Sequence, residues 1–217
     1  MKWIIFFFSL VIVLLIGGCF APVNSYYDSA RMLDRNKSRI GVNYTRYYST
    51  NISFMEDNES SFTNYNNNIG LAAGYGLSEK LNLNVRYEYL KSRSDVDFLG
   101  ETFNDFMNYF EIGCKIRLIE ERMALGLPVG LYLYEGGLTS SISPRLFITL
   151  GNNEKVDFTM VPSVLLTIGD DIGIFPGVNL GIGLSNNLNK WAIRPEIGYN
   201  GVLNFGIGTY FKFSKAK

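Results

Sequence analysis

The chain has 217 residues, of which 47% are hydrophobic and 15% aromatic, and its 20 basic residues balance 20 acidic ones. This length suits one sizeable all-β domain. Without a basic excess or a basic run, the composition gives no reason to expect a nucleic-acid partner. The chain contains no histidine, so it lacks the side chain that most often serves as general base and as transition-metal ligand.

Residues 1–18 predict a signal peptide. Lys2 precedes a mainly apolar run over 3–16, which is too short to cross a bilayer as a helix. The following Ile16-Gly17-Gly18-Cys19 resembles the lipobox of bacterial lipoproteins, which implies cleavage before Cys19 and lipidation of that residue. Cleavage after Ala21 is the alternative, because Cys19 and Ala21 form an A-x-A-like site.

The segment after the signal peptide predicts a tether. Residues 19–37 are polar and lack sustained alternation, so we expect a lipidated N-terminal tether there and a barrel domain over 38–217.

From Arg39 onward the dominant pattern is alternation. Within Leu81–Tyr89, apolar residues occupy every odd position, and Asn, Arg or Glu every even one. The same pattern returns in Phe110–Leu118 and Trp191–Tyr199, with full charges opposite the apolar face. Charge inside and hydrocarbon outside predict an antiparallel up-and-down transmembrane β-barrel. About ten strands are expected, over 39–48, 67–76, 81–90, 108–119, 123–134, 142–150, 155–167, 174–184, 190–199 and 202–213.

The predicted connections differ in length. Four are short and polar, at 77–80, 120–122, 151–154 and 185–189, whereas 49–66 and 91–107 are long. Short turns at one end and longer loops at the other are typical of outer-membrane barrels. The long loops are where we expect an extracellular ligand or partner to bind.

In these features the chain resembles the outer-membrane β-barrel superfamily of bacteria, as a small barrel. Its last strand, Phe205–Phe213, resembles the aromatic-terminated strand that the barrel-insertion machinery recognises, although four residues follow Phe213. The resemblance implies location in the bacterial outer membrane and contact with its lipid. We expect a monomer.

With the apolar face outward, ten charged side chains are predicted to face the lumen and to pair across strands. They are Arg86, Glu88, Glu111, Lys115, Arg117, Arg145, Asp157, Arg194, Glu196 and Lys212. Such side chains would fill a narrow bore. Inward glycines such as Gly74, Gly206 and Gly208 leave room, so a small solute pathway stays open at this point.

The sequence predicts a non-enzymatic protein that is either structural, or interacting through its loops, or a narrow porin-like solute pore. Outer-membrane barrel proteases, phospholipases and acyltransferases resemble one another in using an active-site His, which this chain lacks. No catalytic, cofactor or metal site is expected, and Cys114 falls on an apolar face. The alternative is a periplasm-facing, lipocalin-like lipoprotein barrel that would bind a small lipophile inside.

Overall fold

The computed structural model describes residues 26–48, 65–94, 103–134, 137–151, 154–168, 172–200 and 203–214. The predicted signal peptide and Cys19 lie outside these ranges. No helix long and apolar enough to cross a membrane occurs among the described residues. The strands are β1 Lys37–Tyr48, β2 Tyr65–Ser78, β3 Leu81–Ser94, β4 Phe103–Ile119, β5 Met123–Tyr134, β6 Gly137–Ile142, β7 Arg145–Leu150, β8 Val156–Ile168, β9 Ile172–Leu184, β10 Trp191–Tyr199 and β11 Leu203–Ser214.

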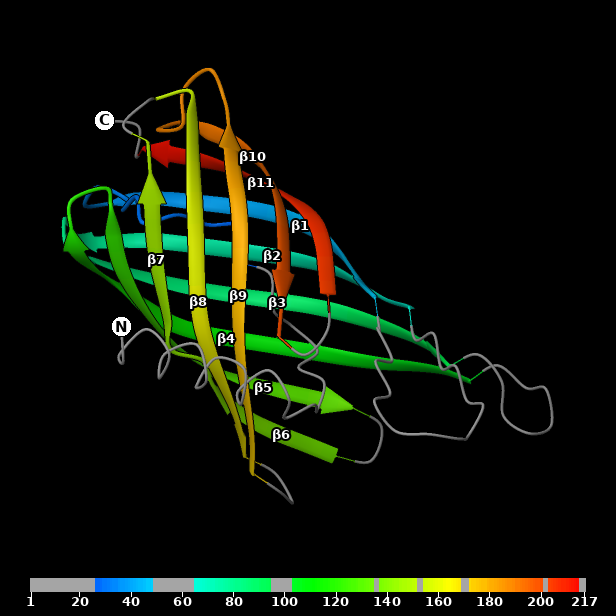
Figure 1. Cartoon of the computed structure of the whole chain (residues 1–217). Helices are drawn as coiled ribbons and strands as arrows, with labels where there is room; N and C mark the ends of the chain where they lie inside the picture. The colour runs from blue at the N-terminus through cyan, green and yellow to red at the C-terminus, as the bar shows by residue number, and fades with distance from the viewer. Residues whose placement is uncertain are drawn as a thin grey trace, which may run out of the picture.

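These strands form one closed antiparallel barrel (Figure 1). Apart from β6 and β7, strands adjacent in sequence pair with one another, and β1 closes the ring by pairing with β11 along Lys37–Tyr48 and Leu203–Ser214. Closure leaves no open sheet edge, which a lipid bilayer would not tolerate. The predicted fold class is confirmed.

The wall has ten strand positions because β6 and β7 share one of them. Both pair with β5 on one side and with β8 on the other. They are separated by Ser143 and Pro144. Pro144 has no N–H to donate, which suits a break in the ladder. The sequence analysis predicted a single strand over 142–150 and missed β6.

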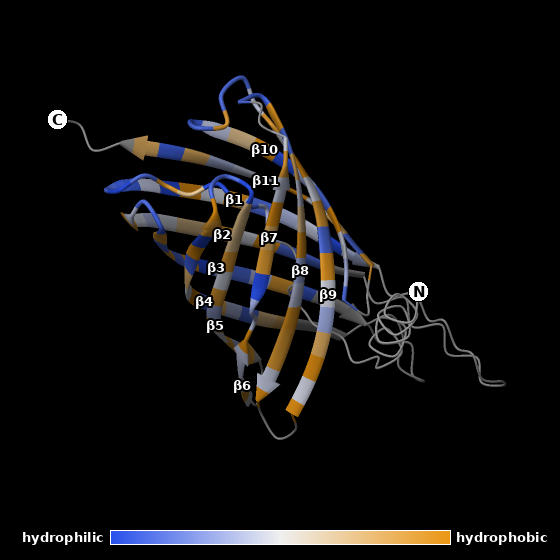
Figure 2. Ribbon diagram, turned by 60° about the vertical axis from the view of Figure 1, so that its left-hand side comes forward, coloured by the Kyte–Doolittle hydropathy of each residue, from blue (hydrophilic) through white to orange (hydrophobic). Residues whose placement is uncertain are grey.

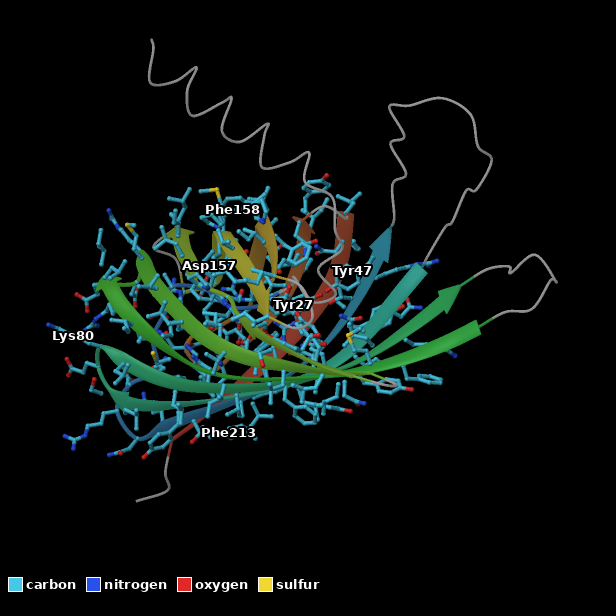
Figure 3. All side chains as sticks on the ribbon, turned by 90° about the horizontal axis from the view of Figure 1, so that it is seen from below. Tyr27, Tyr47, Lys80, Asp157, Phe158 and Phe213 are labelled. Atoms are coloured by element: carbon cyan, nitrogen blue, oxygen red, sulfur yellow. The ribbon has the colours of Figure 1, made fainter. Side chains whose placement is uncertain are left out.

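Hydrophilic and hydrophobic residues alternate along the strands (Figure 2), and this alternation gives the barrel two unlike faces. Large apolar side chains on the outside remain exposed in the isolated chain, among them Ile69, Leu71, Ile112, Val129 and Ile207. In Figure 3, Phe158 and Phe213 project from the outer side, whereas Tyr27, Tyr47 and Asp157 lie between opposite walls. The neighbours Asp157 and Phe158 therefore lie on opposite sides of β8, as a two-residue period requires.

This distribution contradicts the lipocalin-like alternative. A soluble lipophile-binding barrel buries its apolar face in the lumen. Here the lumen holds buried charges such as Glu88, Lys115 and Arg194, and the apolar residues point outward. An outer surface of this kind is stable only against hydrocarbon.

The two rims differ in their connections. At one end the strands are joined by residues 79–80, 120–122, 151–155 and 185–190, and β1 begins there at Lys37. We call this end the short-turn rim. The connections 49–64 and 95–102 belong to the opposite end, the long-loop rim. The strands extend further into both predicted long loops than the sequence analysis expected.

Candidate functional site

The lumen is the site that the fold builds, and its wall is rich in buried charges. Two ion pairs lie within the wall: Arg86 Nε is 2.6 Å from Glu88 Oε1 on β3, and Arg145 Nη2 on β7 is 2.5 Å from Glu111 Oε2 on β4. Tyr109 Oη also donates to Glu111, at 2.8 Å. Charged hydrogen bonds shielded from bulk water are stronger than exposed ones. These contacts hold together one side of the barrel.

A third wall pair joins β8 to β10. Arg194 Nη2 lies 2.5 Å from Asp157 Oδ1, and both side chains are almost fully buried. Arg194 also lies 6.0 Å from the ring centroid of Tyr210 on β11. Arg39 and Lys212 lie near the same ring, at 5.5 and 5.6 Å. Three cations from three strands therefore surround one aromatic side chain in this part of the wall.

One predicted lumen charge lies apart from the others. Arg117, at the short-turn rim, is 3.9 Å from Glu79 and 3.5 Å from Glu120, both of which are strongly exposed. Its ion pairs are therefore rim contacts rather than part of the lumen interior.

The lumen also contains a segment of the chain itself. Residues Tyr26–Asn36, which we call the plug, precede β1, and Tyr27 of this segment lies between opposite walls in Figure 3. The plug runs from Tyr26, which bonds to Glu196 in the lumen, to Asn36 at the short-turn rim, where the Asn36 N–H donates to the Gly76 carbonyl oxygen. Ser29, Ala30 and Leu33 are nearly inaccessible to solvent. The sequence analysis expected a tether over 19–37, but the described part of it packs within the lumen.

Asp28 is the main polar contact between plug and wall. Its carboxylate accepts hydrogen bonds from both Nη atoms of Arg39 on β1, the Nη2 contact measuring 2.9 Å, and from Lys115 Nζ on β4 at 2.9 Å. Burial alone would raise the pKa of Asp28, but the charges and hydrogen bonds of Arg39 and Lys115 hold it well below its usual range. Asp28 is therefore an anion in this structure.

Lys115 also binds the plug backbone. Its Nζ donates to the carbonyl oxygens of Ser29 at 3.0 Å and Arg31 at 3.1 Å. Together with the Asp28 contact, these bonds use the three donors of the ammonium group. One wall side chain thereby binds the plug at three residues, Asp28, Ser29 and Arg31.

Further contacts fix both ends of the plug. Wall residue Glu196 accepts the backbone N–H groups of Tyr26 and Tyr27, each at 2.8 Å. Nearer the short-turn rim, Arg31 Nε is 3.2 Å from Asp157 Oδ2, so this wall carboxylate is shared by Arg194 and the plug. When the Asn82 amide is oriented to match its neighbours, its oxygen accepts from the backbone N–H of Leu33 at 3.0 Å and its nitrogen donates to the Leu33 C=O at 3.3 Å.

Inward glycines make room for the plug. A Cβ added to Gly208 would lie 2.5 Å from both Cβ and Cγ of Tyr27, and one at Gly206 would collide with the Tyr27 hydroxyl. At Gly74, an added Cβ would lie 3.3 Å from Leu33 Cδ1. The space that these predicted inward glycines leave is therefore occupied by the plug.

Sequence reasoning missed three charged participants, which are Arg39 of the wall and Asp28 and Arg31 of the plug. Arg39 shares the inward parity of Gly41, Asn43 and Thr45, a signal that was available in the first predicted strand. Asp28 lies in a segment without strand periodicity, so only its three-dimensional contacts reveal its position.

The described interior retains little free space next to the plug. One cavity of about 50 Å³ is lined by Asp28, Arg39 and Lys115 together with Arg86, Glu111 and Arg145. Another, of about 30 Å³, borders Tyr27 and Asn43. Such polar spaces suit a water or two. A larger hollow of about 830 Å³ lies over the apolar outer face and belongs to the lipid-facing surface.

Chemically, this arrangement can hold an anion and a peptide segment in a low-dielectric bore. In the ranges that the structure describes, no three Cys, Asp or Glu side chains come together as metal ligands. Cys114 is half-buried and forms no disulfide in the described structure.

Comparison with known proteins supports the fold. No protein-family model and no curated protein sequence matches the chain. Among solved structures, an outer-membrane channel from Pseudomonas putida F1 is similar with a TM-score of 0.51 and 9% identity, covering 88% of this chain and all of that one. Ail, the attachment invasion locus protein of Yersinia pestis, matches with a TM-score of 0.34 and 12% identity over 82% of this chain and 99% of Ail.

At these identities the similarity concerns the fold alone. The similarity to the Pseudomonas channel agrees with the closed barrel described above. This chain therefore has the fold of a transmembrane β-barrel with ten strand positions.

Proposed function

We propose that the protein is a non-enzymatic, narrow outer-membrane channel that the plug holds closed in the conformation described. The observation that carries this proposal is the position of residues Tyr26–Asn36 inside the lumen, where their side chains and backbone bond to the wall. The plug lies inside the bore as a segment separate from the strands that form the wall.

The way in which the lumen is filled favours a channel over a purely structural barrel. A barrel without a transport role can fill its bore with side chains from its own strands. This wall instead presents inward glycines, including Gly206 and Gly208, where the plug packs. Removing the plug would therefore leave a polar passage.

Planar-bilayer recording tests the proposal. The full chain should conduct weakly or not at all, whereas the double variant Asp28→Ala/Arg31→Ala should conduct more, because it loses the plug's ion pairs with Arg39, Lys115 and Asp157. Leaving a buried charge without its partner costs about 3–5 kcal/mol, enough to weaken the docked state substantially.

Asp34→Ala is the matched control. Asp34 belongs to the same segment, but its side chain is 71% exposed and pairs with Lys37 at the rim, so its loss should leave the current unchanged. If the double variant is folded, as shown by heat-modifiable gel mobility, and is as silent as the full chain, the channel assignment is wrong. A structural or loop-mediated interaction role would then be the remaining function.

A further inference from the structure

We propose that Arg39 and Lys115 form a binding site for small carboxylate anions, which Asp28 occupies in the closed conformation, and that Arg194 and Lys212 add positive charge beside it. The site would make the channel selective for anions, and this consequence rests on the proposed channel function. Binding of an anion at the site can be tested without recording any current. We call these four residues the basic cluster.

The groups around Asp28 have the geometry of a carboxylate receptor. Arg39 approaches its carboxylate with two N–H groups side by side, and Lys115 Nζ adds a third contact at 2.9 Å. A bidentate guanidinium contact matches the planar shape of a carboxylate, and an ammonium adds charge without a preferred direction. The wall therefore presents a preformed receptor for a carboxylate group.

The carboxylate that pairs with Arg39 and Lys115 comes from the plug and not from the wall. Elsewhere in the lumen, cations pair with carboxylates of the wall, as Arg86 does with Glu88 and Arg145 with Glu111. Among the described residues, the carboxylate that pairs with Arg39 and Lys115 is Asp28, which the plug supplies. When the plug leaves, both cations lose that partner.

Positive charges outnumber negative ones on the wall at this level of the bore. The basic cluster contributes four positive charges. The wall carboxylate that lies beside these cations is Asp157, which is bonded to Arg194. The next wall carboxylate, Glu196, holds the plug backbone at Tyr26 and Tyr27. The plug brings Asp28 and Arg31, so its departure changes no net charge but exposes the cations to the lumen. A bore that is narrow and positive attracts anions and repels cations.

The size of the ligand follows from the site. Asp28 fills it with one carboxylate and a methylene group, and the adjoining cavity adds about 50 Å³. Formate and acetate have the right charge, planarity and dimensions. Formate is therefore the probe.

Chemical rescue tests the site directly. Asp28→Ala removes the carboxylate and leaves a space beside Arg39 and Lys115, so it should lower the midpoint of thermal unfolding of the detergent-extracted protein. Formate, compared with chloride at equal ionic strength, should restore most of that loss, because a ligand that binds only the folded state stabilises it.

Two matched variants define the specificity of the rescue. Asp28→Asn keeps the side-chain volume and leaves no space, so formate should not stabilise it more than chloride does. Asp28→Ala/Lys115→Met retains the space but loses one cation, and its rescue should be reduced severalfold. Equal stabilisation of the full chain, Asp28→Asn and Asp28→Ala by formate would overturn the proposal.

Ion selectivity is the second measurement. In a salt gradient, the reversal potential of Asp28→Ala/Arg31→Ala should show preference for the anion, and adding Lys115→Glu should weaken or invert that preference. A cation-selective current would refute the inferred selectivity while leaving the channel proposal intact. Formate rescue in a protein that never conducts would support the anion site and refute the channel.

Discussion

At the residue scale, the lumen depends on carboxylates that each serve more than one partner. Asp157 binds Arg194 of the wall at 2.5 Å and Arg31 of the plug at 3.2 Å, and its side chain is fully buried. Glu120 makes a contrasting pair at the short-turn rim, where it lies 3.5 Å from Arg117 and is 81% exposed. Solvent screens the second pair but not the first.

Asp157→Ala should therefore destabilise the folded protein by about 3–5 kcal/mol, because two buried guanidinium groups lose their shared partner. Glu120→Ala should cost at most about 1 kcal/mol. Urea unfolding in detergent or lipid, followed by Trp fluorescence, measures both. Similar losses for the two variants would show that the lumen is as well solvated as the rim.

At the element scale, the sequence predicted most of the wall because the constraint that shapes it is local. A strand between lipid and a polar lumen must alternate, and nine of the strand positions follow from this alternation and from the short polar connections between strands. The break at Ser143 and Pro144 was missed because β6 is short and polar, so its residues Thr139, Ser140 and Ser141 give no apolar alternation. The register, and with it the depth of each lipid-facing residue, required the strand pairing.

Depth in the bilayer determines the cost of a charge on the outer face. Ile112 is 51% exposed, lies near the middle of the apolar band and pairs with Val85 and Val129. Ile112→Arg should destabilise by about 2–4 kcal/mol. Leu83 also faces outward, but β3 begins only two residues earlier, at the short-turn rim.

Leu83→Arg is therefore the control, and we expect a cost of at most about 1 kcal/mol for it. Unfolding titrations in lipid vesicles give both values. If Leu83→Arg costs as much as Ile112→Arg, the membrane band extends to the short turns, and the placement of the bilayer midplane at Ile112 is wrong.

At the scale of the whole molecule, plug and barrel form one structure that no local pattern predicts. The plug lacks periodicity, and its partners Arg39, Lys115, Asp157 and Glu196 come from strands distributed around the ring. The lumen charges could be identified from parity alone, but their pairing could not, because an intervening segment takes part in it. The barrel is thus predictable from the sequence, but the presence of a plug inside its bore is not.

A covalent link between plug and wall separates plug movement from other causes of conduction. The Ala30 backbone N–H donates to Thr149 Oγ1 at 2.8 Å, which brings the two residues together inside the bore. Cysteines at both positions, in the Asp28→Ala/Arg31→Ala variant with Cys114→Ser, should form a disulfide that suppresses the current. Reduction should restore it, because the plug is then free to leave.

Each single-cysteine variant is the control and should conduct equally before and after reduction. If the oxidised double-cysteine protein, with its disulfide verified by mass spectrometry, conducts as much as the reduced one, ions pass beside a docked plug. The closing role of residues Tyr26–Asn36 would then be excluded, since their position inside the barrel would not decide whether the bore conducts.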